Sequence, residues 1–276
     1  MDKKQLKKYL IGDFSMTRLL FSLLFIYGAV GLWAYFGSDR LMFLPPPASY
    51  QDKPPFLKLK TPDNQEITAV YLPDLQAKYT ILYSHGNAED LGDILPRLYQ
   101  LRDLGVNIFA YDYQGYGTSQ GKPTEKNAYE DINTAYKYLT ENLKIPANRI
   151  IVYGRSIGSG PSVDLAMRQP VGGLILESAF TTIFRVVTKI PLYPFDKFAN
   201  IEKIPQVSAP VLILHGDADM VIPFTHGQEL FNAVTHNNKL SLWVKEAGHN
   251  DLLETAGNSY IDKMQEFLQL LDQAKK

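Results

Sequence analysis

The chain has 276 residues, of which 45% are hydrophobic, and its formal net charge is −1 at pH 7. This length suits one domain of ordinary size plus a short extension, and the near-neutral charge argues against nucleic acid as a partner. The absence of cysteine excludes disulfides, thiolate metal sites and a cysteine nucleophile, and the five histidines show no metal-binding spacing, so we expect no metal site.

The first element in chain order is an uncharged apolar segment, residues 19–36, which follows a basic segment, residues 1–18. Because a helix rises about 1.5 Å per residue, a segment of this length nearly crosses a bilayer core. Trp33, Tyr35 and Phe36 would lie at one membrane interface, where aromatic side chains gather. We therefore expect a single-pass transmembrane anchor over residues 19–36.

Two alternatives remain open for this apolar segment. A cleaved signal peptide has the same charged start, but no small-x-small cleavage site follows the segment cleanly, and the segment is long for a signal. A helix buried in a soluble core should be amphipathic, whereas this segment is apolar all round. The excess of lysine before it (Lys3, Lys4, Lys7 and Lys8) predicts a cytoplasmic N-terminus and a translocated C-terminal domain.

Residues 37–49 are expected to form a linker, because Pro45-Pro46-Pro47 forces extended chain, and the folded domain is placed at residues 50–276. It should open with two antiparallel edge strands, 56–61 and 66–72. Strands and helices then alternate, which predicts an α/β fold with a mostly parallel, doubly wound sheet covered on both faces. The expected strands are 79–84, 106–111, 149–153, 173–177, 211–215 and 239–245, and the expected helices are 88–104, 125–143, 162–168, 225–234 and 255–271.

The strand at 149–153 leads into Gly154-x-Ser156-x-Gly158 and then into a helix. A serine on a sharp strand-to-helix turn is a nucleophile elbow, and the glycines let the two backbones approach closely. The pattern alone is common in Gly-rich loops, but the strand–turn–helix context favours a nucleophile at Ser156. Pro161 should lie in the first turn of the helix, because it cannot donate to the helical ladder.

Ligands of an open α/β sheet bind beyond the carboxyl ends of its strands, so the residues there are candidates for chemistry. The strand 79–84 ends at His85-Gly86-Asn87, and the N–H groups of Asn87 and Ile157 are expected to form an oxyanion hole. His85 is expected to be a hydrogen-bonded structural residue. The alternative for this loop is a plain Asn/Gly turn.

Two further strand ends supply an acid and a base. Asp217 and Asp219 follow the strand 211–215, and either carboxylate could orient an imidazole, because spacing alone does not choose between them. His249 follows the last strand on a loop that begins with Gly248, and it is the candidate base. The order serine, aspartate, histidine is that of the α/β-hydrolases.

The chain from about residue 50 onward resembles the α/β-hydrolase superfamily, and within it the small single-anchor hydrolases related to the protein depalmitoylases. The segments that carry the resemblance are 43–46, 85–90, 112–119, 154–160 and 215–223. The last matches the family's H-G-x-x-D pattern, and this implies Asp219 as the acid and Asp217 as a loop residue. The resemblance implies a monomeric, membrane-anchored serine hydrolase that cleaves esters or thioesters of lipid-like or small acyl substrates, without a cofactor.

The chain departs from the cytosolic depalmitoylases, which are tethered through a cysteine-rich N-terminus, since it contains no cysteine. A serine peptidase on the same fold is one alternative function, but peptidases commonly add a propeller or a large cap. A catalytically silent scaffold is another, but such proteins usually lack one member of the triad.

The cap over the nucleophile should lie in residues 178–210, which leave room for one packing helix of roughly 10–14 residues but for no separate lid. Prolines interrupt the rest of this stretch, and many of its residues are apolar. We expect some of them to line a shallow, open acyl groove facing the bilayer. Tyr116, Phe180 and Phe184 are the candidate substrate-binding residues.

Overall fold

The computed structural model describes residues 15–188 and 190–273, and it divides into two compact units, Met1–Leu41 and Met42–Lys276. The second unit begins before the expected domain start at residue 50. Residues 42–49, which the sequence analysis assigned to a linker, therefore belong to the folded unit. The physical reason is Phe43, whose aromatic side chain is buried in the hydrophobic core.

The first unit contains α2 (Met16–Gly37), whose 22 residues extend about 33 Å, and the start of the short helix α3 (Asp39–Met42). By length and composition α2 could cross a membrane, and a signal sequence near an N-terminus would meet the same criterion. Lys3, Lys4, Lys7 and Lys8, on which the expected orientation depends, lie outside the described residues.

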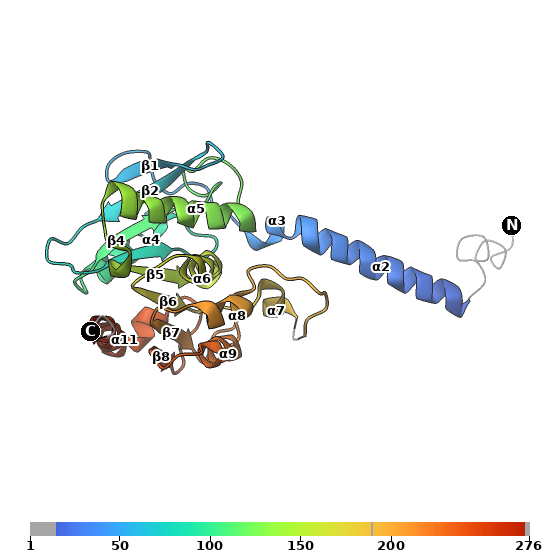
Figure 1. Cartoon of the computed structure of the whole chain (residues 1–276). Coiled ribbons are helices and arrows are strands. Elements are labelled where there is room, and N and C mark those ends of the chain that lie inside the picture. Colours follow the sequence, from blue (N-terminus) through green and yellow to red (C-terminus); the bar gives the residue numbers. More distant parts are fainter. Residues whose placement is uncertain (1–14, 189, 274–276) are drawn as a thin grey trace. The chain divides into compact units, whose positions relative to one another are not determined.

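The second unit is built on one eight-stranded sheet with strand order β1-β2-β4-β3-β5-β6-β7-β8 (Figure 1). β1 pairs antiparallel with β2 and β2 antiparallel with β4, and all other neighbours are parallel. The mostly parallel sheet predicted from the alternating pattern is confirmed. The strands are β1 (Phe56–Lys60), β2 (Glu66–Leu72), β3 (Thr80–Ser84), β4 (Asn107–Tyr111), β5 (Ile150–Arg155), β6 (Gly173–Glu177), β7 (Val211–Gly216) and β8 (Lys239–Val244).

Helices cover both faces of this sheet, and each face has its own hydrophobic core. Alternate residues of the central strand β5 point to the two cores: Ile150 and Val152 to one, Ile151 and Tyr153 to the other. One face carries α5 (Glu125–Lys137), α6 (Ser159–Arg168) and α9 (Thr225–Ala233), and the opposite face carries α4 (Leu91–Arg102), α10 (Leu252–Ala256) and α11 (Asn258–Gln273).

Several helix boundaries differ from the expected ones, and three of the differences concern α4, α5 and the C-terminal helix. α4 begins at Leu91 rather than 88, because the Asp90 side chain caps the helix by accepting from the N–H groups of Gly92 and Asp93. α5 ends at Lys137 and continues as a π-helical turn, Tyr138–Asn142. The expected C-terminal helix is divided into α10 and α11 at Gly257, whose φ of +51° lies in the left-handed region.

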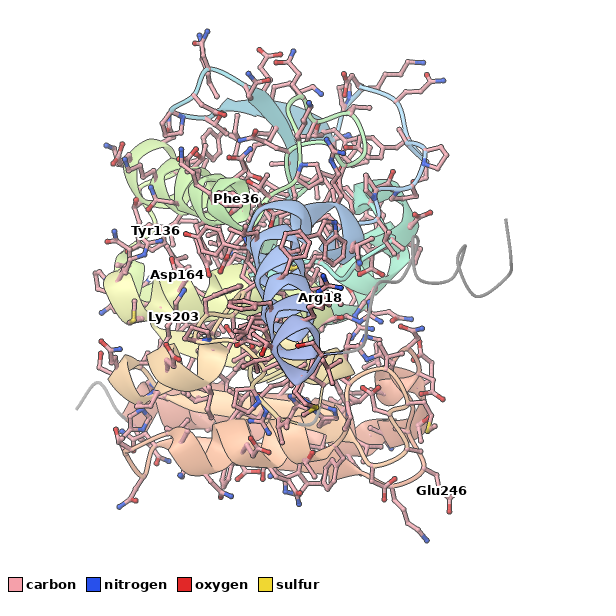
Figure 2. All side chains as sticks on the ribbon, turned by 90° about the vertical axis from the view of Figure 1, so that its right-hand side faces the viewer. Arg18, Phe36, Tyr136, Asp164, Lys203 and Glu246 are labelled. Atoms are coloured by element: carbon pink, nitrogen blue, oxygen red, sulfur yellow. The ribbon has the colours of Figure 1, made fainter. Side chains whose placement is uncertain are left out.

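The segment after β6 contains α7 (Ile183–Val187), α8 (Asn200–Lys203) and a 3₁₀ turn, Ile204–Gln206. The single packing helix expected there is therefore wrong, and the repeated prolines explain why no long helix forms within its described residues. α8 is tied to α6 by an ion pair of 2.8 Å between Lys203 and Asp164 (Figure 2). The cap is short and packs directly against the sheet's own helices.

Candidate active site

Ser156 lies on the turn between β5 and α6, with a φ of +52°, which side-chain-bearing residues rarely adopt. The neighbouring glycines make this turn possible. A Cβ on Gly154 would lie 2.5 Å from the Gly158 carbonyl oxygen, and a Cβ on Gly158 would lie 2.1 Å from the Ser84 carbonyl oxygen. Pro161 lies in the first turn of α6. The local structure is the one that a nucleophile elbow requires.

The loop after β8 brings His249 to this serine. The imidazole Nε2 lies 3.0 Å from Ser156 Oγ, and Nδ1 lies 2.7 Å from Asp219 Oδ2. His249 lies 93 residues after Ser156 and 30 residues after Asp219 in the chain, and the structure brings the three side chains together through these two hydrogen bonds. A base of this kind can remove the serine proton while the carboxylate holds the imidazole orientation.

Asp219, not Asp217, is the aspartate that contacts His249. Its Oδ1 also accepts from the N–H groups of Val221 and Ile222, each at 2.8 Å. Burial alone would raise the pKa of the Asp219 carboxyl, but hydrogen bonds from His215 and His249 and the Ile222 N–H more than offset it and hold the pKa well below its usual value. Asp219 is therefore a fixed carboxylate at neutral pH.

Asp217 has a different environment, although it is only two residues away. Its Oδ1 accepts from the Glu246 N–H at 2.6 Å, so its carboxylate supports the turn that leads into the histidine loop. The side-chain contact explains why an aspartate suits this position without any direct contact with the imidazole.

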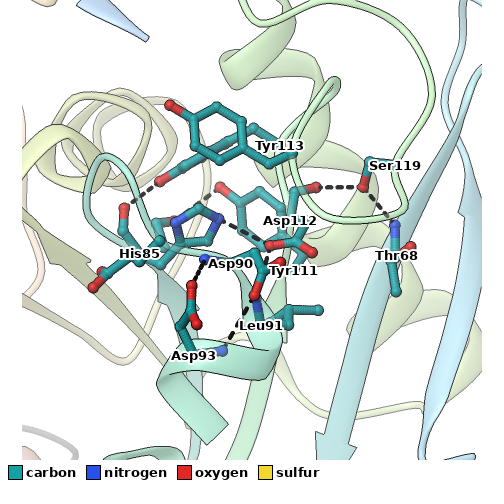
Figure 3. A network of polar contacts seen from close by, with 12 residues as sticks. Thr68, His85, Asp90, Leu91, Asp93, Tyr111, Asp112, Tyr113 and Ser119 are labelled. Atoms are coloured by element: carbon teal, nitrogen blue, oxygen red, sulfur yellow. Dashed lines mark hydrogen bonds and ion pairs between the residues drawn. The ribbon is translucent and has the colours of Figure 1, made fainter. Parts of the chain in front are cut away.

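The loop after β3 lies beside the nucleophile turn, and it contains His85 and Asn87. His85 is fully buried: its Nε2 lies 3.2 Å from Asp112 Oδ1, and its carbonyl accepts from the Tyr113 hydroxyl at 2.7 Å (Figure 3). Asp112 in turn accepts from the Leu91 N–H at 3.0 Å, which ties the loop to the start of α4. The arrangement around His85 is a structural support for the loop.

The Asn87 side chain is engaged by the segment that enters the domain. Its Nδ2 donates to the Met42 carbonyl at 2.6 Å, and its Oδ1 accepts from the Leu44 N–H at 2.9 Å and from the Tyr116 hydroxyl at 2.6 Å. Residues 42–49, named here the entry strap, are thereby fastened to the loop after β3. Sequence reasoning missed this contact, because proline-rich chain gives no signal for a distant partner.

Two of the three expected substrate-binding residues are buried. Tyr116 is held by Asn87 and Leu44, and Phe180 packs beside Phe198 with ring centroids 6.4 Å apart; neither side chain has more than 1% of its surface exposed. This burial argues against both as contacts for an acyl chain. Phe184 on α7 is partly exposed and remains a candidate. Over residues 15–188 and 190–273, no group of three His, Asp or Glu side chains could hold a metal ion.

The sheet order, the serine on the strand-to-helix turn and the acid and histidine after β7 and β8 define the α/β-hydrolase class. A family model described as serine aminopeptidase, S33, matches residues 76–200. The esterase Pf2001 of Pyrococcus furiosus has a similar fold, with a TM-score of 0.68 at 21% identity over 82% of this chain and 98% of that one.

Curated relatives match more closely in sequence. Human alpha/beta hydrolase domain-containing protein 17B is 47% identical over 196 residues, which are 70% of this chain and 67% of that protein. The Caenorhabditis elegans protein aho-3 of the same description is 40% identical over 210 residues, which are 75% of this chain and 62% of that protein. The chain belongs to this family of alpha/beta hydrolase domain-containing proteins.

Proposed function

We propose that this protein is a membrane-anchored serine hydrolase that cleaves carboxylic esters or thioesters through an acyl-enzyme intermediate. The observation that carries the proposal is the position of His249, with one ring nitrogen 3.0 Å from Ser156 Oγ and the other 2.7 Å from Asp219. Both distances are within hydrogen-bond reach for a base and its orienting acid.

In the proposed reaction, His249 removes the Ser156 proton as Oγ attacks the substrate carbonyl carbon. The N–H groups of Ile157 and Asn87 stabilise the negative oxygen of the tetrahedral intermediate. The Asn87 main chain is assigned this role because contacts with the entry strap already occupy its side chain. Protonated His249 then gives its proton to the leaving alcohol or thiol, and a water repeats the attack on the acyl-serine and releases the acid.

An acyl substrate of lipid-like character suits the surroundings of this site. α2 is long and apolar enough to cross a membrane, so we assign it the role of an anchor. The lysine-rich segment before it favours a cytoplasmic N-terminus. In the described part of the cap, Val187, Ile190 and Leu192 expose 88%, 64% and 52% of their surfaces. Such side chains offer exposed apolar surface to an acyl chain, so we assign acyl binding to this segment together with Phe184.

A serine peptidase is the second candidate, favoured by the name of the family model that matches residues 76–200. Peptidases and esterases share the acyl-transfer chemistry, so the triad does not separate them. A catalytically silent scaffold is the third, and the intact row of Ser156, His249 and Asp219 argues against it.

A panel of matched substrates separates these candidates. Ester, thioester and amide derivatives of the same acyl group should be incubated with the detergent-solubilised full-length protein and with its Ser156→Ala variant. We expect turnover of the ester or thioester by the wild type alone. If the wild type cleaved an amide whose acyl group is an amino acid with a free N-terminus faster than the ester and the thioester, the protein would be a peptidase. If the wild type and Ser156→Ala showed the same background rate on every substrate, the scaffold would be favoured.

A further inference from the structure

Arg155 immediately precedes Ser156, and its guanidinium is not used by the reaction described above. The side chain is 6% exposed and lies at the end of β5, between the loop after β3 and the loop after β8. An arginine at such a position can bind several partners at once, because its planar fork presents five donors in fixed directions. The partners of Arg155 lie 66 residues before it and 95 residues after it in the chain.

One side of the guanidinium holds the oxyanion loop. Arg155 Nη1 donates to Glu89 Oε1 at 2.8 Å and to Oε2 at 3.0 Å. Glu89 Oε1 also accepts from the Gly86 N–H at 2.6 Å, so the carboxylate fixes the backbone directly before Asn87. The position of the proposed Asn87 donor therefore depends on Glu89, and Glu89 is held by Arg155.

The other side holds the histidine loop. Arg155 Nη2 donates to Asn250 Oδ1 at 2.7 Å and lies 3.4 Å from the His249 carbonyl oxygen. His249 carries the imidazole that must remain within reach of Ser156 Oγ, and Asn250 is the next residue in the chain. The Arg155 side chain thus contacts both the loop that carries the base and the loop that carries the oxyanion donor, and the residue that follows Arg155 in the chain is the nucleophile, Ser156.

The charge of Arg155 is balanced within the protein. Its Nε lies 3.4 Å from Glu177 Oε1 at the end of β6, and Glu177 also pairs with Arg97 Nη2 of α4 at 2.6 Å. Two guanidinium groups and two carboxylates, those of Glu89 and Glu177, therefore form one neutral cluster. Burial lowers the pKa of Arg155, but the charges of Glu89, Tyr83 and Glu177 together more than offset this and leave the pKa raised, so the cation is retained.

We propose that Arg155 is a positioning residue that sets the distance between the base, the nucleophile and the oxyanion donor, because its guanidinium joins the loops after β3 and β8 and its backbone leads directly into Ser156. The inference rests on the proposed hydrolase function, and it adds a role for a residue outside the triad. Arg97 provides the matched comparison, because within residues 15–188 and 190–273 it binds the same Glu177 carboxylate and hydrogen-bonds to neither of these two loops.

The test compares Arg155→Lys with Arg97→Lys in the full-length protein. A lysine keeps the charge but cannot reach both loops with fixed geometry, so Arg155→Lys should lower kcat roughly 10- to 100-fold with little change in KM, as expected when reacting groups are misplaced by about 1 Å. Arg97→Lys should leave kcat unchanged although both variants lose thermal stability. Equal kcat values for Arg155→Lys and the wild type, or equal losses in both variants, would overturn the inference.

A second variant avoids a change in the buried cluster. Asn250 is exposed, so Asn250→Ala should fold normally, and it should lower kcat in the same direction by releasing only the histidine loop. Amide hydrogen exchange should show faster opening of residues 248–251 in this variant, and of both 86–90 and 248–251 in Arg155→Lys. Unchanged exchange in both loops would disprove the tether itself, whereas a wild type that does not hydrolyse any acyl substrate would disprove the proposed function.

Discussion

At the scale of single residues, the two aspartates after β7 allow a sharp comparison. Asp219→Asn should lower kcat by up to about 10⁴-fold, because an amide in this position favours the wrong imidazole tautomer. Asp217→Asn should be mild, since its remaining carbonyl oxygen can still accept from the Glu246 N–H. Steady-state kinetics of the two variants under identical conditions tests the assignment, and a larger loss in Asp217→Asn would reverse it.

The candidate nucleophile and base could be inferred from sequence, because each follows a recognisable strand and carries a local pattern. The choice between Asp217 and Asp219 could not be made from spacing alone, since it depends on which carboxylate the folded loop directs toward His249. No sequence pattern indicated a role for Arg155. Its partners, Glu89 and Asn250, are distant in sequence, and no local pattern reports a contact of that kind.

At the scale of elements, the entry strap is the part of the domain that a proline-rich sequence conceals. Phe43 is 3% exposed and packs among Tyr113, Tyr116 and Phe198, with ring centroids 6.1 to 6.4 Å away. Phe43→Ala should therefore lower the free energy of unfolding by about 3–5 kcal/mol, the usual cost of emptying a buried aromatic site.

Leu44 is the natural control for that change, because its side chain is 55% exposed while its N–H binds Asn87. Leu44→Ala should keep the wild-type stability, within about 0.5 kcal/mol, in urea unfolding followed by circular dichroism. If Phe43→Ala were as stable as Leu44→Ala, the strap would not be part of the core. The folded domain would then begin near residue 50, as expected from the sequence.

The short cap leads to a prediction about kinetics. α7 has five residues and α8 has four, so neither is long enough to form a hinged lid over Ser156. The rate of hydrolysis of a short-chain ester should therefore rise smoothly as the substrate concentration passes its solubility limit. A sharp increase at that limit would indicate a moving lid and would contradict the assignment of residues 178–210.

Helix and strand positions followed well from periodicity, whereas helix ends depended on individual contacts. The start of α4 is determined by the Asp90 cap, and the division between α10 and α11 by the left-handed Gly257. The apolar residues keep their helical spacing on both sides of Asp90 and of Gly257, so periodicity alone does not show that a helix begins or ends there. The cap was harder still, because its prolines exclude one long helix without specifying which short turns replace it.

At the scale of the whole molecule, the proposed anchor predicts how the full-length protein behaves in membranes. It should remain in the membrane fraction after alkaline carbonate extraction and require detergent for release. The lysine-rich start predicts that the catalytic domain is protected from added protease in sealed vesicles whose outer face is cytoplasmic. Digestion of the domain in intact vesicles would show that the domain lies on the cytoplasmic side. A mature N-terminus near residue 37 would establish a cleaved signal instead of an anchor.

The layered α/β arrangement of the second unit is the most predictable feature of the molecule. Alternating apolar strands and amphipathic helices leave few other ways to bury two sets of helix faces, and the sheet has hydrophobic cores on both sides. The same arrangement places the ends of β3, β5, β7 and β8 at one edge, where the candidate catalytic residues meet.

The central claim is that Ser156 is an activated nucleophile, and covalent labelling tests it most directly. The folded full-length protein should be incubated with a fluorophosphonate, digested and analysed by mass spectrometry. We predict one adduct on the peptide that contains Ser156, no adduct in a folded Ser156→Ala variant, and a loss of hydrolysis of about 10⁶-fold in that variant. Labelling at another serine, or more than a few per cent of wild-type activity in Ser156→Ala, would contradict the account.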